Sequence, residues 1–309
     1  MNVMRKGVLI VGCGYSGRAV ALELLEAGVP VTGTVGDPAH LGAVTATGAV
    51  AERLSLPDAL SGKAREAARK LISRHRAVVY AIGPEREAGE RFVDHTLAFA
   101  DLVSEVPGIE AFVYLSSTGV YGARNGDWVD EETPMATSPG PRGKIRIQVE
   151  NGLLERCRSR GLPVRILRLT GIYGPGRHIG LRLKEGNYRV VDADPPLVVN
   201  RIHVADVAQT VVAAIERGQN GDVVVVSDGH PASLREVADY AARLMGVPPP
   251  ESETLEEAWA RMGEANFHLI ADSKRCRNTR LIEVLGVKLR YPDYRSGLAA
   301  CLSDGGLLP

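Results

Sequence analysis

The stretch Val8-Leu9-Ile10-Val11-Gly12-Cys13-Gly14-Tyr15-Ser16-Gly17 decides the fold of this 309-residue chain. Its first four residues form a continuous apolar run, which is typical of a strand that is buried on both faces. The residues that follow, Arg18 to Ala27, are strong helix formers with an apolar face, and Gly28 can end the helix. The sequence therefore predicts a buried strand, a glycine turn and a helix.

The three glycines of this turn have the GxGxxG spacing of dinucleotide-binding loops. In such loops the first glycine, Gly12, permits a tight turn, and Gly14 lets a diphosphate approach the backbone. Gly17 lets the helix pack closely against the strand. The phosphates would bind the unpaired N–H groups of the first helical turn, at Tyr15 and Ser16. We predict that these five residues bind NAD or NADP; the alternative is an ordinary strand-to-helix turn in another α/β protein.

Strands alternate with helices along the rest of the chain, which predicts an α/β fold with a Rossmann-type doubly wound parallel sheet. We expect strands at residues 8–11, 30–35, 49–54, 77–82, 111–115, 164–169 and 223–227, and helices at residues 18–27, 61–74, 89–105, 141–160, 203–217 and 233–245. Residues 1–170 would form an NAD(P)-binding Rossmann core. Residues 171–309 would complete the sheet (203–245) and form a small C-terminal substrate lobe.

The composition favours a cytoplasmic enzyme that acts on small molecules. Lys plus Arg and Asp plus Glu both number 37, so the net charge is zero and gives no electrostatic footprint for nucleic acid or an anionic membrane. No apolar run approaches the roughly 20 residues that span a bilayer, and no signal-peptide pattern precedes the first strand. We therefore expect neither a nucleic-acid partner nor a membrane.

Cysteines and histidines predict neither a metal site nor disulfides. The four cysteines are widely scattered and form no CxxC pair, and the seven histidines show no HExxH spacing. Cys13 lies inside the glycine turn, where the helix N-terminus would lower its pKa and make it reactive. The alternative is a small side chain that fills a tight turn.

Two further strand ends predict cofactor contacts. Asp37 follows the second strand at about the spacing at which an acidic residue binds the adenosine ribose, and no arginine accompanies it, which favours NAD over NADP. Because Asp37 precedes Pro38, it equally fits a turn or a helix cap. The fourth strand ends in a turn that would lie under the nicotinamide half, so Ala81 and Gly83 are also predicted to contact the cofactor.

Five segments from the fifth strand onward follow one another in a set order. They are Ser116–Gly122 (SSTGVYG), Trp128–Pro134 (WVDEETP), Leu167–Arg177 (LRLTGIYGPGR), Arg201–Ala208 (RIHVADVA) and Val226–Gly229 (VSDG). Together they resemble the extended short-chain dehydrogenase/reductases, the NAD-dependent epimerase/dehydratase group. The resemblance spans nearly the whole chain and implies an NAD(P)-dependent oxidoreductase or epimerase.

The resemblance implies three catalytic side chains. These are a tyrosine that exchanges the substrate proton, a lysine four residues later that holds the cofactor ribose, and a serine that orients the substrate oxygen. Ser117 matches the serine and Lys144 the lysine, but Gly140 stands where the tyrosine is expected. The chain is thus similar to an atypical member that lacks the catalytic tyrosine. Alternatively, Ser117 caps a turn and Lys144 is a solvated helix residue.

Three hypotheses follow from the missing phenol. Another acid substitutes for it, with Tyr121, Tyr173 and His178 as candidates; alternatively, the two tyrosines are structural aromatics and His178 is a solvated loop residue. A second hypothesis is a non-catalytic NAD(P)-binding sensor or scaffold. A third is chemistry that needs no phenol, with Lys144 or a bound water as the base.

Four arginines indicate the substrate class and one pair of helices indicates a partner. Arg177, Arg182, Arg189 and Arg201 would bind an anionic substrate, such as a sugar-nucleotide phosphate, or stand at the surface. The family resemblance also implies a homodimer formed through the helices at residues 89–105 and 141–160.

Overall fold

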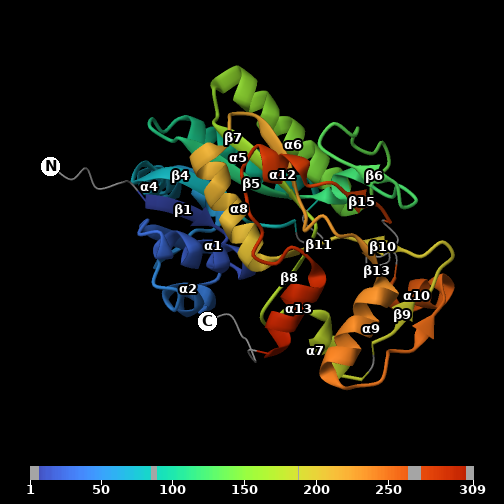
Figure 1. Cartoon of the computed structure of the whole chain (residues 1–309). Coiled ribbons are helices and arrows are strands. Elements are labelled where there is room, and N and C mark those ends of the chain that lie inside the picture. Colours follow the sequence, from blue (N-terminus) through green and yellow to red (C-terminus); the bar gives the residue numbers. More distant parts are fainter. Residues whose placement is uncertain (1–6, 85–88, 187, 264–272, 304–309) are drawn as a thin grey trace.

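A parallel sheet forms the centre of the chain in the computed structural model, which describes residues 7–84, 89–186, 188–263 and 273–303 (Figure 1). Its seven strands stand in the order β12-β7-β5-β4-β1-β2-β3, and each neighbouring pair is parallel. The strands are β1 Gly7–Val11, β2 Val31–Val35, β3 Val50–Arg53, β4 His75–Tyr80, β5 Ala111–Ser117, β7 Val164–Leu169 and β12 Asp222–Val226. The predicted doubly wound Rossmann-type sheet is confirmed.

Helices cover both faces of this sheet. One face packs against α1 Tyr15–Glu26, α2 Leu41–Thr45, α8 Val204–Arg217 and α12 Thr279–Glu283. The other packs against α3 Leu56–Ala59, α4 Gly62–Ser73, α5 Gly89–Ser104 and α6 Pro141–Arg160. In β1, Val8 and Ile10 face the first layer, whereas Leu9 and Val11 face the second. Burial from both sides explains why the strand is apolar without alternation.

The predicted elements differ from the observed ones chiefly at their ends. The fourth strand begins at His75, two residues before the predicted start, because its first side chains are polar but buried with partners. Both ring nitrogens of His75 are hydrogen-bonded, at 2.8 Å to the Leu71 carbonyl and 2.9 Å to the Thr32 hydroxyl. Such pairing removes the cost of burying a polar side chain, and no hydrophobic pattern reveals it.

The C-terminal part of the chain adds short elements beside the sheet's carboxyl edge (Figure 1). They are β8 Gly171–Tyr173, α7 Ile179–Lys184, β9 Val190–Val191, β10 Val198–Val199, β11 Arg201–His203, β13 Ala232–Ser233, α9 Leu234–Met245, β14 Ser252–Glu253, α10 Leu255–Met262 and α13 Tyr294–Ser303. Further short elements are η1 Pro38–His40, η2 Thr118–Tyr121, β6 Trp128–Val129 and β15 Arg275–Cys276. Most of these strands have two or three residues, too few to produce a periodic pattern.

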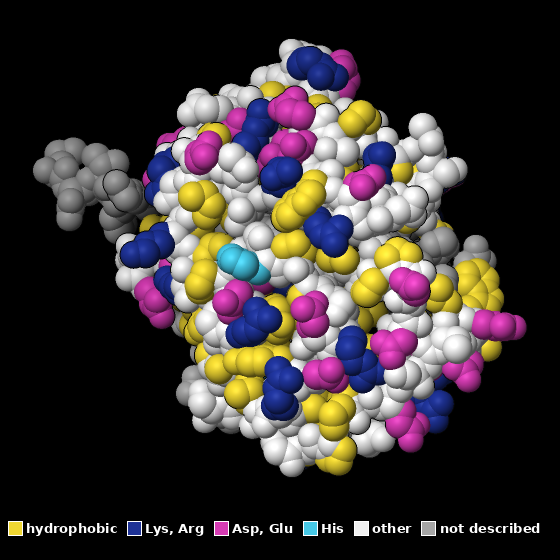
Figure 2. All heavy atoms as spheres, turned by 45° about the vertical axis from the view of Figure 1, so that its right-hand side comes forward, with side chains coloured by type: hydrophobic (Ala, Val, Ile, Leu, Met, Phe, Trp, Pro, Cys, Tyr) yellow, Lys and Arg dark blue, Asp and Glu magenta, His cyan; other side chains and the backbone are white. Residues whose placement is uncertain are grey.

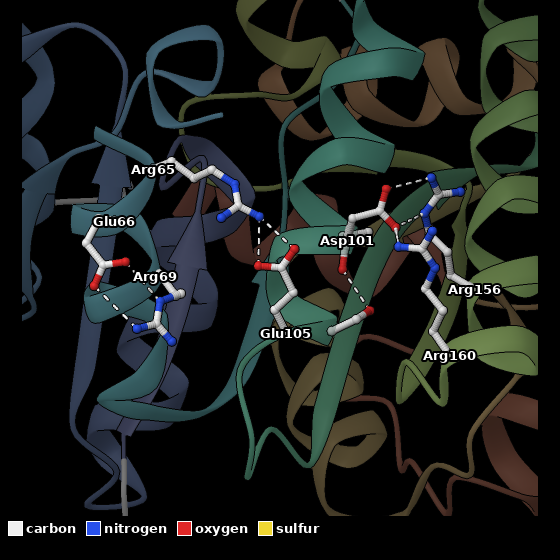
Figure 3. A network of polar contacts seen from close by, with 9 residues as sticks. Arg65, Glu66, Arg69, Asp101, Glu105, Arg156 and Arg160 are labelled. Carbon is white, nitrogen blue, oxygen red and sulfur yellow. Dashed lines mark hydrogen bonds and ion pairs between the residues drawn. The ribbon is translucent and has the colours of Figure 1, made fainter. Parts of the chain in front are cut away.

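Ion pairs cover the outer surface of α4, α5 and α6 (Figure 3). Asp101 of α5 accepts hydrogen bonds from Arg156 and Arg160 of α6, at 2.8 and 2.6 Å, and Arg65 of α4 reaches Glu105 at 2.6 Å. This is the surface through which the family resemblance implies a homodimer, and the dimer stays a prediction. Within the described ranges, no helix is long and apolar enough to cross a bilayer.

Candidate active site

The glycine turn between β1 and α1 has the geometry that the GxGxxG spacing predicts. Gly12 has φ +87°, and a Cβ there would lie 2.6 Å from Cγ1 of Ile82. A Cβ on Gly17 would lie 2.8 Å from the Gly12 carbonyl oxygen, so only glycine allows α1 to pack this closely. A Cβ on Gly14, in contrast, would meet nothing within 4 Å. The turn thus leaves open space directly before the helix.

Gly14 is the N-cap of α1, and no side chain caps this helix end. The N–H groups of the first helical turn, at Tyr15, Ser16 and Gly17, therefore face the open space, where a diphosphate would satisfy them. Arg177 adds a positive charge here, because its guanidinium lies 5.4 Å from the centre of the Tyr15 ring. The Tyr15 hydroxyl donates to the Pro175 carbonyl at 3.1 Å and so holds the Arg177 loop against α1. The residues of this cradle fit a dinucleotide.

Cys13 fills the tight turn behind this cradle. A Cβ on Gly33 of β2 would lie 2.7 Å from Sγ of Cys13. The thiol therefore fills the space that a side chain at position 33 would need. Burial raises the pKa of Cys13 to about 11, against a smaller opposing effect of Arg18. The geometry supports the small-side-chain interpretation, because a thiol with this pKa stays protonated at neutral pH.

Two opposite charges lie at the end of β2, where the adenosine ribose is expected. One carboxylate oxygen of Asp37 accepts a hydrogen bond from the Ala39 N–H at 2.9 Å and caps η1. Arg53, at the end of β3, donates from Nε to the Gly36 carbonyl at 3.2 Å. Both side chains are exposed. The preference for NAD therefore stays a prediction, because Asp37 suits the ribose of NAD whereas Arg53 suits the 2′-phosphate of NADP.

Arg146 on α6 lies where the ends of β4 and β5 meet, beside the predicted contacts Ala81 and Gly83. It donates to the Leu115 carbonyl at 2.6 Å and to the Tyr114 hydroxyl at 2.8 Å. Its Nη2 would lie 3.7 Å from a Cβ on Gly83. Sequence reasoning did not select Arg146.

Lys144, which was selected, lies on a different side of α6. The buried residues Gly143, Glu150 and Leu153 mark the inward face of this helix, and Arg146 follows Gly143 by three residues on that face. Lys144 is exposed. Two helical residues of separation turn Lys144 by about 200° from Arg146. The 3-4-3 spacing of the inward face was the sequence signal that would have identified Arg146.

Ser117 ends β5 and is the N-cap of η2. Its hydroxyl oxygen accepts a hydrogen bond from the Gly119 N–H at 3.1 Å, so both of its proposed roles are compatible with this position. The cap uses the oxygen as an acceptor and leaves the hydroxyl proton to donate to a substrate oxygen. Ser117 is partly exposed at the carboxyl edge of the sheet.

Tyr121 lies in the interior, in what we call the closed network: Ser116, Tyr121, Glu150 and Arg168. The Arg168 guanidinium donates to the Tyr121 hydroxyl at 2.7 Å and to both Glu150 oxygens, and Ser116 donates to Glu150 at 2.5 Å. Tyr121 and Glu150 are both 0 % exposed. Burial raises the pKa of the Tyr121 phenol further above its ordinary value. These contacts match the structural-aromatic interpretation of Tyr121.

The other two candidate acids are Tyr173 and His178, which are distant from Ser117 in the sequence and contact other residues. Tyr173 is buried and its hydroxyl donates to the Asp293 carbonyl at 3.4 Å. Its ring meets the His203 ring edge-on, with centres 5.2 Å apart. His178 is partly exposed, and burial lowers its pKa below the ordinary value. The described residues include no group of three or more His, Cys, Asp or Glu that could hold a metal ion.

Comparison with known protein families shows to which family this chain belongs. A profile of the NAD dependent epimerase/dehydratase family matches residues 8–227, which include the glycine turn, Ser117 and α6. The chain belongs to this family. This epimerase/dehydratase chain shares 28% identity over 292 residues with protein YeeZ of Escherichia coli strain K12, across 93% of the chain and 97% of YeeZ.

Solved structures show the same fold over nearly the full length. A functionally unknown conserved protein from Silicibacter pomeroyi is 31% identical, with a TM-score of 0.79, and the alignment covers 98% of this chain and all (100%) of that one. The dTDP-glucose 4,6-dehydratase of Bacillus anthracis, solved in complex with NAD, has a TM-score of 0.78 at 18% identity and coverages of 96% and 95%. At that identity the likeness concerns the fold.

Proposed function

We propose that this family member is an NAD(P)-dependent oxidoreductase or epimerase-like enzyme of a small molecule. The observation that carries the proposal is the open, uncapped N-terminus of α1 at Gly14. A helix end without a capping side chain leaves N–H groups that a diphosphate satisfies. The NAD held by a dehydratase of the same fold supports this assignment.

The dinucleotide would be held at three places along the sheet edge. Backbone N–H groups at Gly14 to Gly17 and the Arg177 guanidinium would bind the diphosphate. Asp37 and Arg53 would stand at the adenosine ribose, and Arg146 beside Gly83 would stand at the nicotinamide half. When bound, the dinucleotide supplies hydride acceptance or donation at a carbon that carries a hydroxyl or carbonyl group.

This chain's own residues would orient the reacting oxygen and set the local charge. Ser117 donates its hydroxyl proton to the substrate oxygen while its oxygen is held by the Gly119 N–H. Arg146, fixed by the Leu115 carbonyl, provides a permanent cation two residues after Lys144, the residue that matches the family's lysine. Four residues before Arg146 stands the exposed Arg142, and four before Lys144 stands Gly140, so neither alignment supplies a phenol.

Non-catalytic dinucleotide binding is the second candidate. It is favoured by the contacts of Tyr121, whose hydroxyl is committed to Arg168 inside the closed network. Under this alternative the protein binds NAD(P) and a ligand as a sensor or scaffold, and nicotinamide absorbance does not change with any alcohol or carbonyl compound.

The test of the proposal is a titration of the purified chain with NADH and NADPH, followed by nicotinamide fluorescence. Gly14→Ala is expected to fold normally, because its Cβ meets nothing within 4 Å, but to weaken binding about tenfold or more by obstructing the diphosphate. Gly42→Ala is the matched control, since its Cβ also meets no atom within 4 Å and it lies on α2. Equal affinity of wild type and both variants, or no binding by wild type, would contradict the proposal.

A further inference from the structure

The structure distinguishes the four arginines that the sequence selected for anion binding. Arg177 lies over the Tyr15 ring, and Arg182 lies 4.3 Å from the centre of the Tyr188 ring. Arg189 forms an ion pair with Glu251 at 3.2 Å. Figure 2 shows basic and acidic side chains interspersed over the face that it draws, so a positive charge at the surface does not by itself mark a site.

Arg201 differs from the other three. It is the first residue of β11, which pairs with β8 directly after the sheet strand β7. Its Nε is buried and has no hydrogen-bond partner, and its guanidinium forms no ion pair with another residue of the described part of the chain. The side chain as a whole is only partly buried, so the remaining N–H groups of the fork keep an open side.

Polar side chains lie near Arg201, but none of those in the described part of the chain forms a hydrogen bond or ion pair with its guanidinium. Tyr173, Tyr188 and Tyr294 lie close enough to influence its charge, and so does Asp228. The Asp228 N–H donates to the Arg201 carbonyl at 2.9 Å, which places the two side chains on neighbouring segments. One Asp228 oxygen accepts from the His230 N–H at 2.9 Å, whereas Oδ2 is buried without a partner.

A guanidinium in this position is costly to the folded chain. Burial lowers the pKa of Arg201, which means that the protein interior disfavours its charge. An unpaired buried charge destabilises a protein, and removing it is neutral or stabilising. A group that costs stability and presents an open fork for two parallel hydrogen bonds is typical of ligand recognition.

Resting on the proposed function for the role of the bound compound, we infer that Arg201 binds a carboxylate group of the substrate. Asp228 favours a carboxylate over a phosphate, because a second negative charge on the ligand would meet the Asp228 carboxylate beside the guanidinium. The proposed reaction exchanges hydride at a carbon that carries a hydroxyl or carbonyl group, so the carboxylate would belong to a hydroxylated compound. The substrate class is therefore a hydroxylated carboxylic acid.

Asp228 makes this site dependent on pH. Burial raises the pKa of Asp228 to about 7. Below that pH Asp228 is neutral, so only the ligand's carboxylate interacts with the charge of Arg201. Above that pH the Asp228 anion competes with the ligand for the Arg201 guanidinium. Carboxylate affinity is thus expected to fall as the pH rises through about 7. The other titratable or charged groups that interact with Asp228 are His230, Asp293, Tyr173 and Cys276.

The experiment measures binding of D-gluconate by calorimetry, with sorbitol as the uncharged match and inorganic phosphate as the other anion. Wild type is expected to bind gluconate at least about tenfold more tightly than either probe. Arg201→Met should abolish this preference, Arg201→Lys should retain part of it, and Asp228→Asn should remove its pH dependence. Arg243→Met, which removes an exposed arginine of α9, should leave gluconate affinity unchanged.

Thermal unfolding of the same variants excludes a merely structural role. Without ligand, Arg201→Met should have a Tm equal to or above that of wild type, whereas a structural arginine would lower it or prevent folding. A lower Tm, unchanged gluconate affinity in Arg201→Met, preference for phosphate, or no gluconate binding by wild type up to about 50 mM would each overturn the inference. NADPH binding, followed separately, should be unchanged in Arg201→Met; its absence in wild type would contradict the proposed function alone.

Discussion

Two arginines at the carboxyl side of the sheet have opposite environments. Arg168, at the end of β7, is 3 % exposed and bonds to Glu150 and Tyr121 in the closed network. Arg201, on β11, has a buried Nε without a partner. The same residue type thus serves two purposes: a fully paired guanidinium holds α6 against β7, and an unpaired one remains available to a ligand.

The largest expected effect comes from breaking the closed network on one side. Arg168→Met leaves the fully buried Glu150 without its counter-charge, which should lower the free energy of unfolding by roughly 3–5 kcal/mol. The double variant Arg168→Met with Glu150→Leu should regain most of this loss. Urea unfolding of the single and double variants measures both values. Equal losses in both variants would show that the network is not paired as described.

Asp228→Asn tests the open side of the comparison. Folding raises the Asp228 pKa from 3.8 to about 7. Between pH 3.8 and about 7, Asp228 is therefore protonated in the folded chain but ionised in the unfolded chain. Stability therefore falls as the pH rises through this window. The variant should remove that slope and be more stable than wild type at about pH 8 by up to about 4 kcal/mol, because one pKa unit corresponds to about 1.4 kcal/mol. Asp94→Asn, an exposed change on α5, serves as control, and an unchanged slope in Asp228→Asn would refute the argument.

Arg146 is intermediate, since it has partners but stands at the sheet edge. Arg146→Met is expected to weaken NADPH binding about tenfold, because the cation beside Gly83 is lost, whereas Lys144→Met should change it less than about twofold. Fluorescence titration compares the two. The reverse order would instead support Lys144 as the residue that contacts the cofactor ribose.

Tyr121→Phe should have the smallest effect. It removes one acceptor from Arg168, which should cost about 1 kcal/mol of unfolding free energy, and it should leave any turnover with NAD(P) intact. Loss of turnover without loss of stability would instead make Tyr121 the missing acid.

The sequence predicted the sheet well because buried parallel strands are continuous apolar runs, as Val8 to Val11 show. It predicted the shape of the glycine turn for a similar reason, since backbone conformation at Gly12 and Gly17 is specified locally. It selected the exposed Lys144 and not Arg146, because alignment to a motif takes no account of which face of α6 a residue occupies; the role of Lys144 stays a prediction. It could not separate Arg201 from three other arginines, because partners such as Glu251 come from distant segments.

The hydrogen bond from Tyr15 to the Pro175 carbonyl joins two parts of the chain that are 160 residues apart. The first residue of α1 thereby anchors the loop that leads from β8 into α7. A diphosphate seated on that helix end would rigidify this loop before a second compound arrives. Kinetic studies should accordingly find a compulsory order of addition, with the nucleotide first.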